Sequence, residues 1–252
     1  MKKSIIILAI TALMASGHIK AQEVKLIPGQ LTLVDYFSTE ASHRFAEDAP
    51  FSIDSLLSIT MSTESFYNSL ENKQISYIVA DTVSHRKKDG VLRLPIGETY
   101  IELEDERGEG GVMYGNFYKG QIPFLNSYLI LFTGNEFLYY FLIDKTTGED
   151  SGYRFADYPF ISPNKQYGVC IYANPYFSTA EMQIWKIAGD ELDLLYSFNF
   201  VNWMPTTYTT SLRWIDDNSF VVKAIHPQSF WDEKGYENET GEYIKIEILQ
   251  QK

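Results

Sequence analysis

Residue types that carry chemistry are few in this sequence and stand far apart. No two of the four histidines have the H-x-x-x-H spacing that sets two metal ligands on one helix face. The only cysteine, Cys170, lies in "YGVCIY", which predicts a buried strand residue rather than a nucleophile. His226 precedes Pro227 in a loop, where an exposed histidine is expected. With no G-x-S-x-G elbow in the chain, the sequence favours a non-enzyme with no metal and no cofactor.

Acidic residues are numerous, but most have a structural explanation. The run "ELEDERGEGG" (102–111) lacks the D-x-D-x-D-G order of a calcium loop and predicts a solvated acidic turn. Asp216-Asp217-Asn218 is explained by turn formation. A glycosidase needs two carboxylates on opposite sides of a sugar. The loop acids that could converge in this way are Asp157, Asp232 and Glu233. A carbohydrate-active enzyme is therefore the alternative to a binding protein.

Aromatic residues make up 15% of the chain, and several occur in long segments between strand-like runs. These segments are "ANPYFSTA", "NFVNWMPTTYTT" and "HPQSFWDEKGYENETGE". Aromatics in loops on a rigid scaffold are typical of binding surfaces, although they can also fold back to cap a core. The candidate ligand-binding residues are Tyr176, Phe177, Trp203, Tyr208, Phe230, Trp231 and Tyr236.

The elements that would position these loops are short strands. Runs such as "YLILF", "FLYYFLID", "MQIWKI", "FVVKAI" and "YIKIEIL" are rich in β-branched and aromatic residues and are separated by Gly, Asn, Asp and Pro. The sequence therefore predicts an all-β fold. One minor helical element is expected near residues 54–70, where apolar residues recur at helical spacing.

The strands recur as a unit. Residues 124–149, residues 160–192 and the segment that begins "RWIDDNSFVVKAIHP" each start with an apolar pair, make a polar turn and enter a buried strand. Successive copies are roughly 40 to 53 residues apart, the spacing of four-stranded propeller blades. We expect an array of three- to four-stranded antiparallel blades that forms one domain over residues 22–252. A β-sandwich is the alternative fold.

Two turn motifs carry a family resemblance that covers residues 115–249. "FISPNKQYGVCIY" resembles a blade of the Tol-type or WD-repeat propellers, with Ser162 and Pro163 matching while Asn164 and Lys165 replace Asp and Gly. "LIDKTTGE" (142–149) is similar to the Asp-x-x-Thr-Gly turn of quinoprotein-like repeats. These motifs describe turn geometry, so they imply blades without implying a quinone cofactor.

The blade arrangement makes a prediction about faces. Strands of a blade run outward in order, so the long second-to-third and fourth-to-first connections emerge on one face and the short turns on the other. "SPNKQ" and "AGDE" would lie on the turn face, and all seven aromatics on the opposite face. This arrangement predicts a non-enzymatic module that binds a protein or a glycan through an aromatic-rich face.

The N-terminus predicts export. Lys2 and Lys3 precede an apolar run, and small residues and Ala21 follow it, as in a cleavable signal peptide of residues 1–21. The run is too short to span a membrane, so we expect a periplasmic or extracellular protein with no transmembrane segment. The mature chain would carry 18 basic and 33 acidic residues, a net charge of −15. This charge argues against nucleic acid and anionic membranes as partners.

Overall fold

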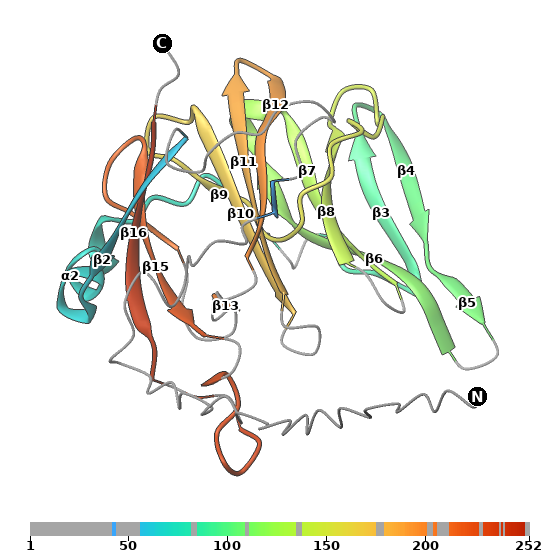
Figure 1. Cartoon of the computed structure of the whole chain (residues 1–252). Helices are drawn as coiled ribbons and strands as arrows, with labels where there is room; N and C mark the ends of the chain where they lie inside the picture. Colours follow the sequence, from blue (N-terminus) through green and yellow to red (C-terminus); the bar gives the residue numbers. More distant parts are fainter. Residues whose placement is uncertain are drawn as a thin grey trace, which may run out of the picture.

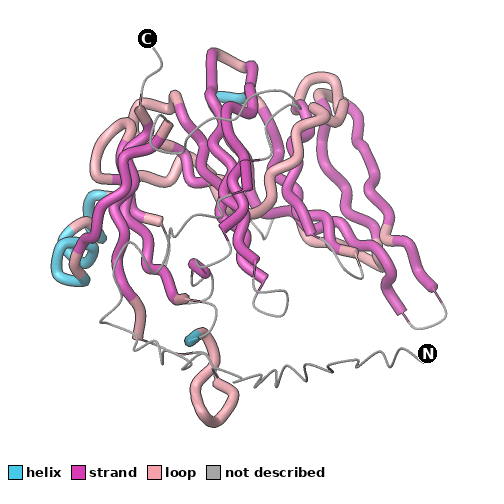
Figure 2. Tube along the Cα trace, in the orientation of Figure 1, coloured by secondary structure: helices cyan, strands magenta, loops and turns pink. Residues whose placement is uncertain are grey.

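The computed structural model describes about two thirds of the chain, mainly as a set of antiparallel sheets (Figure 1). The described residues are 42–43, 56–81, 85–108, 111–134, 138–174, 179–200, 204–205, 212–226, 229–236, 238 and 240–249. The candidate signal peptide lies outside them. Strands dominate the described chain (Figure 2), and the predicted all-β class is confirmed. No helix in this part is long and apolar enough to span a membrane.

The first sheet has the order β5-β6-β7-β8 and is built from strands consecutive in the chain. Its strands are β5 (Glu106–Gly108), β6 (Gly111–Ile122), β7 (Ser127–Thr133) and β8 (Leu138–Asp144), with the short helix η3 (Pro123–Leu125) between β6 and β7. The run "YLILF" lies in β7, which pairs with its chain neighbours β6 and β8. A hairpin of β3 (Val91–Ile96) and β4 (Thr99–Glu104) precedes this sheet.

The central sheet has the order β1-β12-β11-β10-β9. β9 (Phe160–Ile161), β10 (Tyr167–Asn174), β11 (Thr179–Ala188) and β12 (Glu191–Phe200) pair in chain order, and β1 (Ser42–His43) adds to the outer edge. The predicted turn at Ser162 joins β9 to β10. The Ser162 hydroxyl accepts a hydrogen bond from the Tyr167 N–H at 2.9 Å. Lys165 adopts φ +62° at the position where the motif has glycine.

The C-terminal sheet combines strands from both ends of the described chain. β15 (Ser219–Ile225) and β16 (Glu242–Ile248) form a hairpin, with β13 (Met204–Pro205) and β14 (Arg213–Trp214) both pairing with β15. The other edge is β2 (Leu57–Ser62), which pairs with β16 from Leu57 opposite Ile248 to Ser62 opposite Tyr243. Pairing is thus local within the first sheet and from β9 to β12, whereas β1 and β2 are distant strands.

The expected helix at 54–70 is shorter than predicted. Only α2 (Glu64–Ser69) is α-helical, followed by the 3-10 turn η2 (Glu71–Lys73), while residues 57–62 form β2. Thr63 marks the boundary, because its backbone is extended and its side chain accepts the Phe66 N–H at 3.2 Å as an N-cap. Pairing with β16 selects the strand for the preceding residues, since local apolar spacing alone suits either structure.

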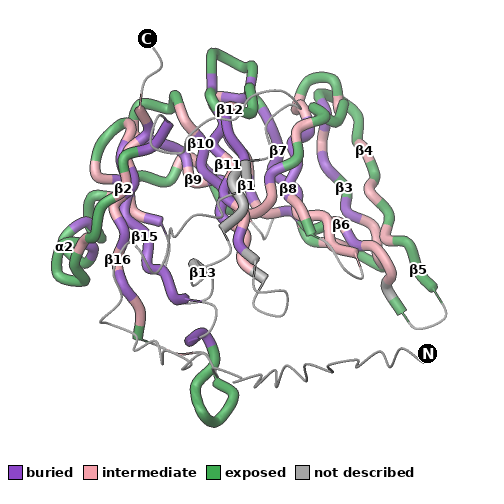
Figure 3. The backbone as a smooth tube through the Cα atoms, viewed as in Figure 1, coloured by how far each residue is buried: buried purple, intermediate pink, exposed green. Residues whose placement is uncertain are grey.

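The sheets stack face to face, and both faces of the central sheet are buried (Figure 3). One face, with Val169 and Met182, packs on the C-terminal sheet around Phe220. The other face packs on the first sheet, where Cys170 and Trp185 meet Leu129, Leu142 and Phe155. The outer ends of the stack are covered by the β3–β4 hairpin and by α2. Burial on both faces explains why β10 reads as an almost continuous apolar run.

Residues 74–79 connect the inner edges of all three sheets. The Gln74 side chain accepts the Trp214 N–H at 2.8 Å and donates to the Trp214 carbonyl at 3.0 Å, as a neighbouring strand would. The Tyr77 hydroxyl donates to the Pro163 carbonyl beside β9. Val79 forms a two-bond backbone bridge with Gln121 of β6. This segment therefore holds the sheets in register with one another.

Candidate functional site

The predicted aromatic face is described in part. Tyr176, Phe177, Trp203 and Tyr208 lie outside the described residues, so their placement remains a prediction. The other three lie in residues 229–236, on the side where the β10–β11 and β15–β16 connections emerge (Figure 1). We call this side the loop face.

The three described aromatics differ in exposure. Trp231 is 43% exposed and Tyr236 is 69% exposed, as a binding surface requires. Phe230 is only 4% exposed and belongs to the core between the central and C-terminal sheets. Its ring and that of Trp231 are nearly perpendicular, with their centroids 4.9 Å apart. Phe230 therefore behaves as the core-capping alternative predicts, and we omit it from the candidate surface. His226 at the start of this loop is buried rather than exposed, so the expectation for it is wrong.

The exposed aromatics stand on an ordered turn. One carboxylate oxygen of Asp232 accepts the N–H groups of Lys234 and Tyr236, both at 2.8 Å. The Asp232 N–H donates in turn to the Tyr236 carbonyl at 2.7 Å. The backbone between Trp231 and Tyr236 is therefore held by its own hydrogen bonds. The same bonds give Asp232 a structural role, which weakens its candidacy as a hydrolytic acid.

A hollow of about 230 Å³ opens near the loop-face ends of the first and central sheets. We call it the Glu181 hollow. It lies beside the first residues of β8, the end of β10 and the beginning of β11, and its walls also include residues 155–156. Its principal lining residues are Leu138, Tyr139, Arg154, Tyr172, Glu181 and Gln183.

Hydrogen bonds fix the polar groups of this hollow. The Gln183 side-chain oxygen accepts the Ala156 N–H at 2.9 Å and the Trp185 indole N–H at 3.2 Å. The Gln183 amide then donates to Oε1 of Glu181 at 3.0 Å. The hydroxyl of buried Ser197 donates to the same oxygen at 3.0 Å. The carboxylate is thus oriented by two neutral donors before any ligand arrives.

The row of residues along β11 explains how this network arises. Alternate residues point to opposite faces of a strand, and Met182 and Ile184 pack toward the C-terminal sheet. Trp185 and Ile187 pack toward the first sheet. Glu181 and Gln183 continue that second row toward the loop face, where the apolar packing ends. Neither Glu181 nor Gln183 was among the predicted site residues, although two polar residues in one row of a strand buried on both faces indicate a polar site.

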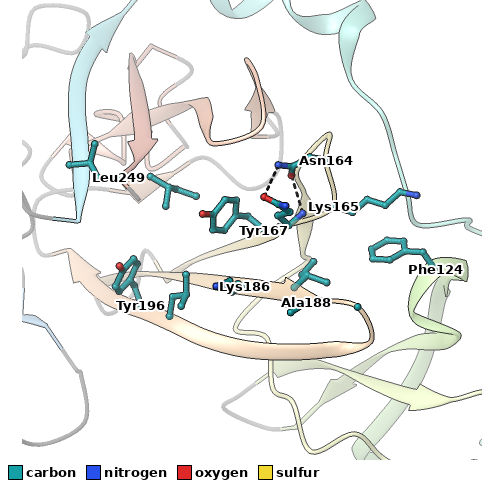
Figure 4. Close-up of a pocket in the computed structure, with 13 residues that line it drawn as sticks. Phe124, Asn164, Lys165, Tyr167, Lys186, Ala188, Tyr196 and Leu249 are labelled. Atoms are coloured by element: carbon teal, nitrogen blue, oxygen red, sulfur yellow. Dashed lines mark hydrogen bonds between the residues drawn. The ribbon is translucent and has the colours of Figure 1, made fainter. Parts of the chain in front are cut away.

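A second and larger hollow, of about 730 Å³, lies on the opposite face (Figure 4). The predicted turns line it: residues 164–167 join β9 to β10, and residues 188–189 join β11 to β12. Tyr167, Tyr196 and Leu249 form another part of its wall (Figure 4). The Lys165 side chain extends away from these residues, and its Nζ lies 5.2 Å from the centre of the Phe124 ring. This hollow was not expected on the turn face.

The remaining chemical candidates sit apart from these hollows. Cys170 is fully buried, as predicted, and burial raises the pKa of its thiol. Burial also raises the pKa of Asp157 to about 6, while the Tyr158 N–H, at 2.6 Å from its carboxylate, and Lys119 act in the opposite direction. Among the described residues, no group of three His, Cys, Asp or Glu side chains could hold a metal ion.

Comparison with known proteins adds no relative, since no protein-family model, no curated protein and no solved structure matches this chain.

Proposed function

We propose that the protein is an exported, non-enzymatic binding module whose sheets are propeller-like blades and whose loop face engages a protein or a glycan. The observation that carries the proposal is the exposure of Trp231 and Tyr236 on an ordered turn. A large aromatic side chain in water on a fixed backbone offers contact area that costs little conformational entropy when a ligand binds. The Glu181 hollow adds a concave element on the same face.

Strand order supports the blade interpretation. β9, β10, β11 and β12 follow one another outward in chain order, and β14, β15 and β16 repeat that order with β2 as the fourth strand. The short first strands β9 and β14 are each two residues long and each precede a polar turn. Neighbouring sheets bury their facing sides, as blades do.

The test compares loop-face and turn-face variants of the mature chain on a glycan microarray and in cross-linking with periplasmic extract. Trp231→Ala and Tyr236→Ala should each weaken binding of the ligand found for the wild type by about 1 to 4 kcal/mol, as interface anchors do. Both variants should keep the wild-type melting temperature within a few degrees. Glu191→Gln, beside the turn-face hollow, is the matched surface control and should bind as the wild type does. Equal binding by all variants, or loss only in Glu191→Gln, would show that the loop face is not the binding surface.

A carbohydrate-active enzyme is the second candidate, and the raised pKa of Asp157 is the observation that favours it. A carboxylic acid that titrates near pH 6 can donate a proton to a leaving group, as a glycosidase acid does. Hydrolysis of chromogenic glycosides by the wild type and its loss in Asp157→Asn would establish this activity. A wild type that turns over no glycoside in such a panel leaves the binding module as the function.

A further inference from the structure

We infer that the Glu181 hollow binds a cationic group, the side chain of a lysine or arginine presented by a protein partner. This inference rests on the proposed function, because it specifies the chemistry of one ligand contact on the loop face. It depends on four features of the hollow: an uncommitted carboxylate oxygen, a fixed hydrogen-bond network, an aromatic neighbour and the local balance of charge.

The first feature is the unequal use of the two oxygens of Glu181. Both hydrogen bonds that it accepts, from Gln183 and from Ser197, go to Oε1. Oε2 accepts no hydrogen bond from the described residues. No lysine, arginine or histidine in the described part of the chain forms an ion pair with this carboxylate. A partly buried carboxylate without a counter-charge is unfavourable in the unliganded protein, so an arriving cation gains the full benefit of pairing with it.

The second feature is rigidity. Gln183 is held through the Ala156 N–H and the Trp185 indole, so it cannot rotate away without breaking two hydrogen bonds. Ser197 is 8% exposed and is held within β12. A carboxylate that is already oriented loses little entropy on binding, which favours a specific contact over loose electrostatic attraction.

The third feature is the aromatic neighbour. Tyr172 lies directly opposite Glu181 in the β10–β11 pair, and directly opposite residues share a face of the sheet with their Cβ atoms about 5 Å apart. Tyr172 also lines the hollow. An ammonium or guanidinium group beside a tyrosine ring and a carboxylate gains from both, since the ring face is negative. A volume of about 230 Å³ equals that of about eight waters and accommodates the five heavy atoms of a lysine side chain beyond Cα.

The fourth feature is charge. Among the described residues that line the hollow, Arg154 is the only cation, and Asp150 neutralises it through two hydrogen bonds of 2.9 and 2.7 Å. Glu181 therefore leaves the hollow with one net negative charge, in a chain that is itself strongly acidic. Sugar hydroxyls could donate to Oε2 but would leave this charge uncompensated, so the observations favour a basic protein over a neutral glycan. Metal coordination is disfavoured because no group of three His, Cys, Asp or Glu side chains in the described chain could hold a metal ion.

The test uses the Trp185 indole N–H as a reporter, because it is linked to Glu181 through Gln183. The full mature protein, labelled with ¹⁵N, is titrated with the blocked tripeptides Gly-Lys-Gly and Gly-Arg-Gly. The matched control tripeptide carries norleucine, which has the four-carbon chain of lysine without the ammonium group. Chitotriose and maltotriose are titrated in parallel as neutral glycans.

The expected result is a saturable shift of the Trp185 indole signal with the lysine and arginine peptides and none with norleucine. Glu181→Gln keeps the acceptor oxygen for Gln183 and Ser197 but removes the charge. This change should weaken the binding of the lysine and arginine peptides about ten- to hundredfold. Glu191→Gln, an exposed residue on the turn face, should leave their binding unchanged.

Equal shifts with the lysine and norleucine peptides would overturn the inference, and this comparison needs no variant to fold. Unchanged affinity in a folded Glu181→Gln would overturn it too. Shifts with an oligosaccharide alone would assign the hollow to a glycan, which removes the cationic ligand but leaves the proposed binding function in place. A Trp185 signal that responds to no probe would also refute the inference, while the Trp231 and Tyr236 variants decide the proposed function separately.

Discussion

Replacing Asp157 by asparagine should stabilise the protein at neutral pH and have no effect in acid. Burial raises the pKa of this carboxyl from 3.8 to about 6, which means that the folded protein disfavours its charged form. Each pKa unit corresponds to about 1.4 kcal/mol, so the charged carboxylate costs the folded state at most about 3 kcal/mol. Asparagine removes this cost and keeps the side-chain oxygen that accepts the Tyr158 N–H.

The sign of the pH dependence follows from the two pKa values. Between about pH 4 and pH 6 the folded state binds more protons than the unfolded state, so wild-type stability falls as the pH rises through this window. The gain from asparagine should therefore be near zero below about pH 4 and should reach a plateau of about 1 to 3 kcal/mol above about pH 7. Raised pKa values of acids always give this direction, which is opposite to that of a carboxylate in an ion pair.

The assay is urea unfolding of the wild type and Asp157→Asn at five pH values across this range, followed by tryptophan fluorescence. Asp217→Asn, at an exposed turn position, controls for the substitution itself because its side chain faces water in both states. A stability difference that is independent of pH, or one that grows toward acid, would refute the reasoning. The first result would mean that folding leaves the pKa of Asp157 unchanged, and the second that the folded protein stabilises its carboxylate as an anion.

Three further outcomes are expected. Gly148→Val should lower the free energy of unfolding by about 2 to 4 kcal/mol, because φ is +77° and an added Cβ would lie 2.8 Å from Ile101. Chemical denaturation measures this free energy, and an unchanged value would contradict the turn geometry. Phe230→Ala should cost about 3 to 5 kcal/mol, whereas Trp231→Ala should cost less than about 1 kcal/mol; equal losses in thermal unfolding would show that both rings are core. Intact-mass measurement of the exported protein should give a chain that begins at Gln22, and a mass that retains residues 1–21 would refute cleavage there.

Much of the fold follows from local sequence rules. Alternation and β-branched content locate β7, β10, β11 and β15, because each of these strands is decided mainly by its own residues. Turns are equally local: Asp144 accepts the N–H groups of Thr146 and Thr147 at 2.7 Å, as the Asp-x-x-Thr-Gly motif predicts. The helix predicted at residues 57–62 was wrong for a different reason, since the conformation of these residues depends on their pairing with the distant strand β16.

The candidate site was less predictable. Phe230 and Trp231 are neighbours in one loop, yet one is in the core and the other is in water. No local rule separates them, because the direction of a loop side chain depends on backbone torsions that the turn around Asp232 sets. Glu181 could not be predicted for a related reason, because its surroundings depend on which sheet covers each face of β11. Sequence periodicity assigns residues to faces but does not identify the neighbour.

The pairing of β2 with β16 has a consequence for the order in which the chain can fold. β2 is translated well before β16, so Leu56 and Leu57 lack the C-terminal sheet that covers them while the intervening residues are being made. β9 to β12, by contrast, pair with one another in chain order, and β1, which adds to β12, is translated before them, so this sheet can associate as soon as β12 is complete. We therefore expect folding to proceed from the middle of the chain outward, with contacts of long sequence separation forming last because they close the largest loop.

A chain truncated before β16 consequently exposes surfaces that β16 would otherwise cover. Any product that ends before residue 242 lacks β16, exposing both the apolar residues of β2 and the open edge of β15. Unpaired edges of this kind aggregate or are cleaved by proteases. β16 thus joins two distant parts of the described chain, because it covers β2 on one side and β15 on the other.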